Sequence, residues 1–201
     1  MHLIFKHTKI NNKKEEKGLS LIESAMVLAL AATVTAGVMF YYQSASDSNK
    51  TQSAISEVMS ATSAINGLFI GQSNYGQLTS NVLINSSAIP DNYKNGTEIM
   101  NPFGGNLKVG VPGNNRNNFG YYLQLTKLPK SACISLATLN LGTSAAGYGI
   151  NITDPTNATI NNATLSTSVA KNSAISPSEA ADTSTGCKNN NNENSVTYFM
   201  K

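Results

Sequence analysis

Three residues near the N-terminus, Gly18, Leu19 and Glu23, have the types and the spacing that a cut in the chain followed by pairing of opposite charges would need. Gly18 ends a lysine-rich front segment, and Leu19 begins an apolar run in which Glu23 is the only charged residue up to position 42. A cut after Gly18 would turn the α-amino group of Leu19 into a new cation. Residues i and i+4 share one helix face. In an assembly of such helices, Glu23 of one copy could neutralise the amine of the next copy and so fix the axial register.

A second interpretation of Glu23 requires no cut. A charge at the centre of a membrane helix costs about 2.5–3.5 kcal/mol, but Glu23 lies only one turn inside the apolar run. Its side chain could therefore reach back to the membrane surface, close to the positive end of the helix dipole. The residues by themselves leave both interpretations open.

The element that must position these residues is a long apolar helix. Eighteen of the 24 residues from 19 to 42 are apolar, and residues 24–46 carry no charge. About 20 mainly apolar residues are enough to cross a bilayer, whereas a secretory signal peptide has a shorter apolar region. Lysines precede the run, which predicts a cytoplasmic N-terminus and places the rest of the chain outside the membrane. These lysines are Lys6, Lys9, Lys13, Lys14 and Lys17.

Helical periodicity continues beyond residue 46. Apolar residues recur there at steps of three and four, which predicts one buried helix face, and Glu57 falls outside this face. No proline interrupts residues 19–89. We therefore expect one continuous helix of about 50 residues, about 75 Å long, whose second half packs on a globular head. The residues of the expected face are Ala54, Ile55, Val58, Met59, Thr62, Ile65 and Phe69.

The rest of the chain predicts an α+β head built on an antiparallel sheet. Short runs with strand character alternate with Gly, Asn and Pro. One of two helical stretches begins with a capping box of Ser176 and Glu179, with Pro177 at the first helical position. The expected strands are 105–109, 119–125, 147–152 and 196–200, and the expected helices are 130–141 and 176–181.

These patterns divide the chain into three segments. Residues 1–18 form a lysine-rich front segment, which would be a leader if the chain is cut after Gly18, residues 19–70 form the long helix, and residues 71–201 form the head. Within the helix, residues 19–42 are the membrane and assembly half, and residues 43–70 are the half that packs on the head.

The composition of the head limits its chemistry. Both histidines, His2 and His7, lie in the front segment, so a chain cut after Gly18 contains none. That excludes Ser-His-Asp and Cys-His catalysis and removes the commonest zinc ligand. The two cysteines, Cys133 and Cys187, lie in the part placed outside the membrane, where an oxidising compartment predicts one disulfide. We expect no cofactor and no metal, and a net charge of +3 is too small for a nucleic-acid partner.

The N-terminal sequence KGLSLIESAMVLALAATVTAG resembles the class III leader and N-terminal helix of type IV pilins. The shared pattern is Gly18 at the cut, Leu19 as an apolar first mature residue, Glu23 at the fifth mature position and an unbroken apolar run. The length of the leader, and Leu in place of Phe after the cut, are similar to the type IVb subclass. Further matching segments are YYQSASDSNK, NPFGG, SLATLNLGTSA and VTYFMK, so the resemblance covers most of the chain. The chain departs from many pilins in lacking a proline in the second half of the apolar run, where only Gly37 weakens the helix.

The resemblance implies a type IV pilin fold and the function of major structural subunit of a type IVb, bundle-forming pilus. It implies that a prepilin peptidase cuts after Gly18 and N-methylates Leu19, and that the mature chain polymerises through its helix with Glu23 in the register role. The Cys133–Cys187 bridge would pin the C-terminal region to the rest of the head. The precursor would lie in the bacterial inner membrane with a periplasmic head, and the mature subunit in an extracellular fibre. The implied partners are an assembly platform, cytoplasmic ATPases, an outer-membrane secretin and the host-cell surface, with auto-aggregation and adherence as the roles of the fibre.

Other functions would use the same residues differently. A minor pilin often lacks the acid at the fifth mature position, and a type II secretion pseudopilin would carry Phe after the cut and a calcium site near the C-terminus. A soluble secreted protein would instead be cut near Ser46. A membrane-anchored enzyme would need paired carboxylates, and nothing in the sequence places a pair in a pocket. The available pairs are Asp91 with Glu98 and Glu179 with Asp182.

Overall fold

The computed structural model describes residues 20–87, 89–113, 119–162, 164–188 and 192–201. The chain divides into two compact units, Met1–Gln43 and Ser44–Lys201. One helix, α1 (Leu21–Leu68), contributes its first half to the first unit and its second half to the second. The long continuous helix expected from the sequence is therefore present.

The described part of the first unit is helical from Leu21 onward. Its large apolar side chains are exposed, with exposed fractions from 59% at Val27 to 88% at Leu21. By length and composition α1 contains a segment that could cross a membrane, and the same property is shared by some signal sequences and core helices. The other exposed large apolar residues of this segment are Ile22, Met26, Leu28, Leu30, Val34, Val38, Met39, Phe40, Tyr41 and Tyr42.

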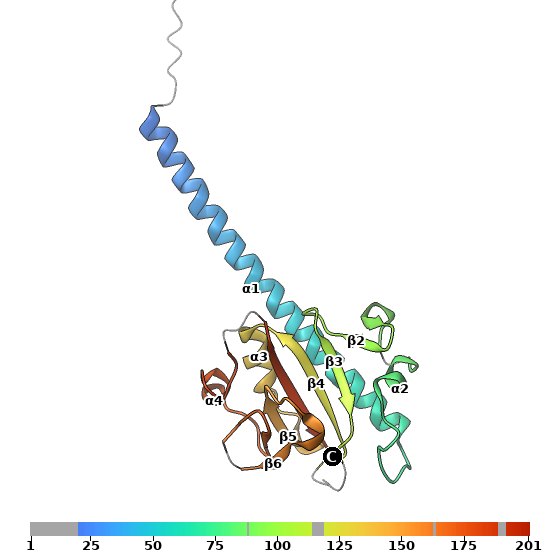
Figure 1. Ribbon diagram of the computed structural model, residues 1–201. Coiled ribbons are helices and arrows are strands. Elements are labelled where there is room, and N and C mark those ends of the chain that lie inside the picture. Colours follow the sequence, from blue (N-terminus) through green and yellow to red (C-terminus); the bar gives the residue numbers. More distant parts are fainter. Residues whose placement is uncertain (1–19, 88, 114–118, 163, 189–191) are drawn as a thin grey trace, which may run out of the picture. The chain divides into compact units, whose positions relative to one another are not determined.

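The second unit is built on an eight-stranded sheet with the strand order β1-β2-β3-β4-β8-β5-β7-β6. All neighbouring strands are antiparallel except β6 and β7, which are parallel. The C-terminal strand β8, red in Figure 1, lies between β4 and β5. The α+β class with an antiparallel sheet is confirmed. The strands are β1 (Lys94–Asn95), β2 (Glu98–Met100), β3 (Asn106–Gly110), β4 (Tyr121–Leu128), β5 (Ala145–Ile150), β6 (Thr159–Asn161), β7 (Val169–Lys171) and β8 (Asn194–Met200).

Three short helices complete the described head. The expected capping box is present: Glu179 N donates to Ser176 Oγ at 3.3 Å, and Ser176 N donates to Glu179 Oε2 at 2.9 Å. The expected helix 130–141 is wrong beyond Ala137, because Thr138 caps the helix and its hydroxyl donates back to the carbonyl of Ile134. The helices are α2 (Ser80–Ile84), α3 (Lys130–Ala137) and α4 (Pro177–Ala181), with 3₁₀ turns at Asp91–Tyr93, Gly142–Ser144 and Pro155–Asn157.

The main core lies between one face of the sheet, the second half of α1 and α3. Alternate residues of the central strands point into it, such as Leu123 of β4 and Tyr198 of β8. The Tyr198 hydroxyl donates to the carbonyl of Leu136 in α3 at 2.7 Å, so the one polar atom of this buried ring is satisfied. From α1 the core receives Ala54, Val58, Ala61 and Ile65.

The buried face of α1 differs from the expected face at Ala61, Met59 and Glu57, and Ala61 is fully buried although it was not expected there. The fully buried residues are spaced at steps of four, three and four from Ala54 to Ile65, so the face is centred on two alanines. Met59 lies beside this face and is 57% exposed, although it was expected in the core. Glu57 lies three residues after Ala54 and four before Ala61, so it is drawn into the interior and is only 5% exposed. The expectation that Glu57 falls outside the buried face is therefore wrong.

The NPFGG segment forms a tight turn that connects β2 to β3. Asn101, 3% exposed, accepts hydrogen bonds from Phe103 N at 2.9 Å and Gly105 N at 3.1 Å, and its amide donates to Thr126 O at 2.8 Å. A Cβ at Gly105 would collide with the Thr126 carbonyl, and Gly104 has a φ of +82°. The two glycines are therefore required by a close backbone approach and by a left-handed turn.

Candidate assembly site

The described helix α1 begins with a capping box. Ser20 N donates to Glu23 Oε2 at 2.8 Å, and Glu23 N donates to Ser20 Oγ at 3.2 Å. Two backbone N–H groups that the helix start leaves without intrahelical partners are thus satisfied. The carboxylate is held at the positive end of the helix dipole, beside the first residues of the helix.

This cap was missed in the sequence, although its signal was there. Ser20-Leu21-Ile22-Glu23 has the same S-x-x-E spacing as the capping box at Ser176. Only Oε2 of Glu23 takes part in the cap, and among the described residues Oε1 accepts no hydrogen bond. One carboxylate oxygen of Glu23 is therefore free to accept a cation from outside the described chain.

The residues that follow Glu23 form an apolar surface around the whole helix. Between Ser24 and Ser46 no residue is charged, and the large apolar side chains of this stretch are at least 59% exposed. Soluble proteins rarely leave so large an apolar surface in water, because about 25 cal/mol is gained for each Å² removed from it. The surface must be covered by lipid or by protein.

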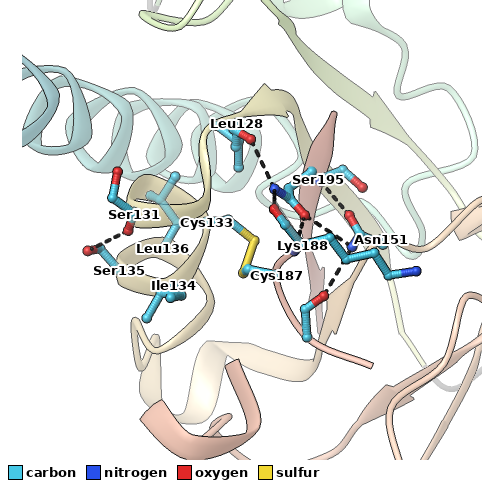
Figure 2. Close-up of a disulfide and its surroundings, with 12 residues drawn as sticks. Leu128, Ser131, Cys133, Ile134, Ser135, Leu136, Asn151, Cys187, Lys188 and Ser195 are labelled. Carbon is cyan, nitrogen blue, oxygen red and sulfur yellow. Dashed lines mark hydrogen bonds between the residues drawn. A yellow bond between two sulfur atoms is a disulfide. The ribbon is translucent and has the colours of Figure 1, made fainter. Parts of the chain in front are cut away.

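Cys133 and Cys187 form a disulfide across 54 residues of sequence, so the expected bridge is present. Figure 2 shows that it joins α3 to the segment that leads into β8. Both residues are fully buried, and Cys187 N donates to the carbonyl of Ala180 at the end of α4 at 2.8 Å. The bridge thus connects α3, α4 and the central C-terminal strand.

A buried asparagine holds the same segment beside the disulfide. Asn194, at the start of β8, is fully buried. Its amide donates to Leu128 O at 3.3 Å and to Lys188 O at 2.9 Å, while Lys188 N donates to Asn194 Oδ1 at 2.7 Å. Asn151 donates to the same oxygen and accepts from Ser195 N at 2.9 Å (Figure 2). Cys187 and Lys188 are therefore held beside the start of β8 by one covalent bond and by hydrogen bonds that are buried or half-buried.

We expect Asn194→Ala to lower the free energy of unfolding by about 3 kcal/mol, because buried polar groups left without a partner cost about 1–3 kcal/mol each. Urea unfolding of the purified, detergent-solubilised chain, followed by circular dichroism, measures this loss. Asn66→Ala is the matched control, since Asn66 is exposed on α1. Equal unfolding midpoints for the two variants would contradict a structural role for Asn194.

A sequence profile of the Bundlin family matches residues 43–201. The major structural subunit of the bundle-forming pilus of Escherichia coli O111:H- is 68% identical over 196 residues, which cover 96% of this chain and 99% of that protein. This chain belongs to the bundlin family. The subunit of the same name from Escherichia coli O127:H6 (strain E2348/69 / EPEC) matches with the same identity and coverage. The crystal structure of a type IV b pilin from Salmonella typhi matches 73% of this bundlin-family chain and 98% of that chain, at 18% identity and a TM-score of 0.46.

Membership of the bundlin family makes the chain a structural subunit and not an enzyme. Three of the four acids considered for catalysis, Asp91, Glu179 and Asp182, have hydrogen-bond or ion-pair partners in the head, and Glu98 is exposed on β2. Lys94 pairs with Asp91 at 2.8 Å and Lys171 pairs with Glu179 at 2.6 Å. The hydrogen bond from Lys171, with those from Ser176, lowers the pKa of Glu179 to about 2, and hydrogen bonds from Ser184 and Thr185 lower the pKa of Asp182. A lowered pKa is the opposite of what a general acid needs, because a general acid must hold its proton near neutral pH.

The two residues at the expected cut in this bundlin-family chain, Gly18 and Leu19, lie outside the described residues. Glu23 is described, and its cap places the carboxylate next to Ser20, the residue that follows Leu19 in the sequence. Within the described ranges, no three His, Cys, Asp or Glu side chains gather in a way that could hold a metal ion.

Proposed function

We propose that this chain is the major structural subunit of a type IVb, bundle-forming pilus. The single observation that carries the proposal is 68% identity over nearly the full length of two proteins that bear that name. As a pilus subunit, the chain polymerises with copies of itself into an extracellular fibre. The apolar surface of residues 21–42 is what such a polymer needs, because a fibre interior of packed helices covers it completely.

Processing by a prepilin peptidase is the first step of the proposed mechanism. The enzyme cuts after Gly18, which removes the lysine-rich leader, and N-methylates the new terminus at Leu19. Until then the apolar half of α1 keeps the precursor in the inner membrane with its head in the periplasm. The cut leaves a positive amine one residue before the helix cap at Ser20.

Glu23 sets the register of assembly in this mechanism. Its Oε2 stays on the backbone of its own helix, and its Oε1 accepts the Leu19 amine of the neighbouring copy. The capping box supports this role because it fixes the carboxylate before the neighbour arrives, so little side-chain entropy is lost on pairing. Moving the helix from lipid into a protein core exchanges one apolar environment for another. The charge pair then selects one axial position among many of similar energy.

The remaining partners of the proposal are those of a pilus machine. An assembly platform with cytoplasmic ATPases extends and retracts the fibre, and a secretin carries it through the outer membrane. Fibre heads then mediate auto-aggregation and contact with host cells. The disulfide supports this extracellular role, because such bonds persist in an oxidising environment, and the Asn194 network helps it to hold the head together there.

Gly18→Ala is expected to leave an uncut precursor in the inner membrane and to abolish fibres. The peptidase must reach the peptide bond beside residue 18, and a methyl group at that position obstructs it. Mass spectrometry of the membrane fraction reports the mass of the uncut chain, and electron microscopy of the cell surface reports fibres. Ser20→Ala, two residues beyond the cut, is the control that should still be processed. Normal fibres from Gly18→Ala would contradict the processing step.

A further inference from the structure

Glu57 is a buried acid that has no partner in the described part of the chain. It lies on the core-facing side of α1 and is 5% exposed. Among the described residues neither of its carboxylate oxygens has a hydrogen-bond partner, and neither oxygen has significant contact with solvent. Proteins rarely tolerate such a group, because removing a carboxylate from water costs several kcal/mol unless a cation or hydrogen-bond donors compensate.

A cavity of about 450 Å³ opens beside this residue. One wall is α1, where Glu57 lies among neutral polar residues such as Gln52 and Ser56, and the other wall is the segment around Tyr93. Since a water molecule takes up about 30 Å³ of liquid, the cavity is large enough for the end of a long side chain. The bonds of the Glu57 side chain can rotate its carboxylate from the interior toward this space.

The described chain supplies no counter-ion at this place. On α1 the nearest charged residues in sequence are Lys50, two turns away and exposed, and Asp47. On the facing segment Lys94 is already paired with Asp91 at 2.8 Å, and Tyr93 contributes a neutral phenol. Burial therefore raises the pKa of Glu57 to about 8, with no charge to offset it. In the single subunit the carboxyl group is mostly neutral near pH 7.

We propose that the cavity beside Glu57 receives a lysine ammonium group from a second copy of this chain, so that the fibre contains an ion pair that the single subunit lacks. The inference rests on the proposed function, since only a polymer brings a second copy to this surface. A second copy supplies the cation that the buried acid lacks: of the nine basic residues in 19–201, eight are lysines. Among the described lysines, those outside the two ion pairs of the head are Lys50, Lys108, Lys127, Lys130, Lys188 and Lys201.

Pairing of Glu57 with an ammonium group predicts a pH dependence of assembly that burial of Glu57 without a partner does not. When the ammonium group enters, Glu57 gives up its proton to solvent and remains ionised in the fibre. Each subunit that joins therefore releases up to one proton below about pH 8, so assembly strengthens as pH rises, by at most about tenfold per pH unit. A carboxyl group that stayed neutral in the fibre would give no gain below that pH and would weaken assembly above it.

The test compares Glu57→Gln with Glu98→Gln in the processed, full-length protein. Glu98 is an exposed acid on β2, so its variant loses the same charge without touching the cavity. The subunit concentration left in the supernatant after fibres are pelleted is measured from about pH 6 to about pH 8. We expect assembly of Glu57→Gln not to strengthen as pH rises. Near pH 8 its subunit concentration in the supernatant should be about tenfold higher than that of the wild type, which corresponds to a tenfold lower affinity. Its detergent-solubilised monomer should melt at or above the wild-type temperature, because an unpaired acid has been removed.

A lysine scan then identifies the partner. Each of the six lysines is changed to Gln, alone and with Glu57→Gln; the partner is the one whose single variant shows the same loss and adds nothing to the double variant. Glu57→Gln fibres that match Glu98→Gln fibres would overturn the proposal. So would an effect that depends on added Na⁺ or Ca²⁺ and couples to no lysine, because the occupant is then a small cation. If the wild-type chain forms no fibres in the same assay, it is the proposed function that fails.

Discussion

Cys187→Ser is expected to lower the free energy of unfolding by about 4 kcal/mol. The bridge closes a loop of 54 residues, and the chain-entropy model gives about 4 kcal/mol for a loop of that length. Since a domain of this size is stable by only about 5–15 kcal/mol, the variant loses a large share of its margin. In cells we expect degradation of the subunit in the periplasm and few or no fibres.

The position of the bridge determines which part of the head loosens when it is lost. Cys187 lies between the end of α4 and the start of β8, and β8 is the strand on which both neighbours in the sheet centre depend. Without the bridge, only hydrogen bonds hold Cys187 and Lys188 in place, from Cys187 N to the Ala180 carbonyl and between Lys188 and Asn194. Loosening these residues therefore frees the central strand and not merely a surface loop.

Denaturation of the purified chain with and without reductant measures this contribution directly. Cys133→Ser should behave like Cys187→Ser, and the double variant should be no worse than either, because all three lack the same bond. The reduced wild-type chain serves as the matched control without a substitution. A reduced chain that unfolds at the same urea concentration as the oxidised chain would contradict the prediction.

The features that could be predicted from sequence are those with a local physical cause. An uncharged apolar run without proline gave the helix α1, and the spacing of Ser176, Pro177 and Glu179 gave the start of α4. The four longest strands were expected within two or three residues of their ends, because alternating apolar residues between turn signals mark them. The bridge followed from two cysteines placed outside the membrane. For the helices and strands a few neighbouring residues contain the whole signal, and for the bridge the number of cysteines and the compartment contain it.

The elements that were missed depend on distant contacts. Strands β1, β2, β6 and β7 are two or three residues long, too short for an alternating pattern, and they exist because the strands beside them offer hydrogen bonds. The parallel pairing of β6 with β7 has no local signal either. Such edges of the sheet are determined by tertiary structure.

The buried face of α1 shows why the candidate site was only partly predictable. Counting apolar residues placed the larger side chain of Met59 in the core and Glu57 outside it, and both placements are wrong. Ala54 and Ala61 are both fully buried. Ala54 was expected on this face but Ala61 was not, because one alanine adds little apolar surface to a hydropathy pattern. The acid between them is buried with them, and no pattern of residue types predicts that.

Glu23→Gln is expected to be processed normally and yet to reduce fibre yield by about 100-fold or more. The substitution keeps the helix cap, because a glutamine at this position also reaches back to the Ser20 N–H. It removes only the negative charge. The Leu19 amine of the neighbouring copy is then buried in an apolar core without a counter-ion, which costs about 3–5 kcal/mol, and each 1.4 kcal/mol is a factor of ten in affinity.

Ser20→Ala is the matched variant, because it breaks the other half of the cap and keeps the charge. It loses the Glu23 N–H bond at 3.2 Å, worth about 1 kcal/mol, so its fibre yield should fall by less than about tenfold. Glu23→Ala, which removes cap and charge together, should be as poor as Glu23→Gln. The processed fraction of each variant is read by mass spectrometry, and the fibres are quantified by pelleting them from sheared cells.

Ranking these three variants by fibre yield distinguishes two roles of the Glu23 carboxylate. If the charge pairs with a neighbouring amine, Glu23→Gln fails and Ser20→Ala assembles. If the carboxylate matters only as a cap, Ser20→Ala and Glu23→Ala share the defect and Glu23→Gln is spared. A mixture of Glu23→Gln and wild-type subunits sharpens the distinction, because each variant copy then leaves one wild-type amine unpaired. Fibres grown from the mixture should therefore leave the variant out, to an extent that grows with the fraction of variant subunits in the mixture. A capping defect would instead weaken only the helix of the variant copy itself.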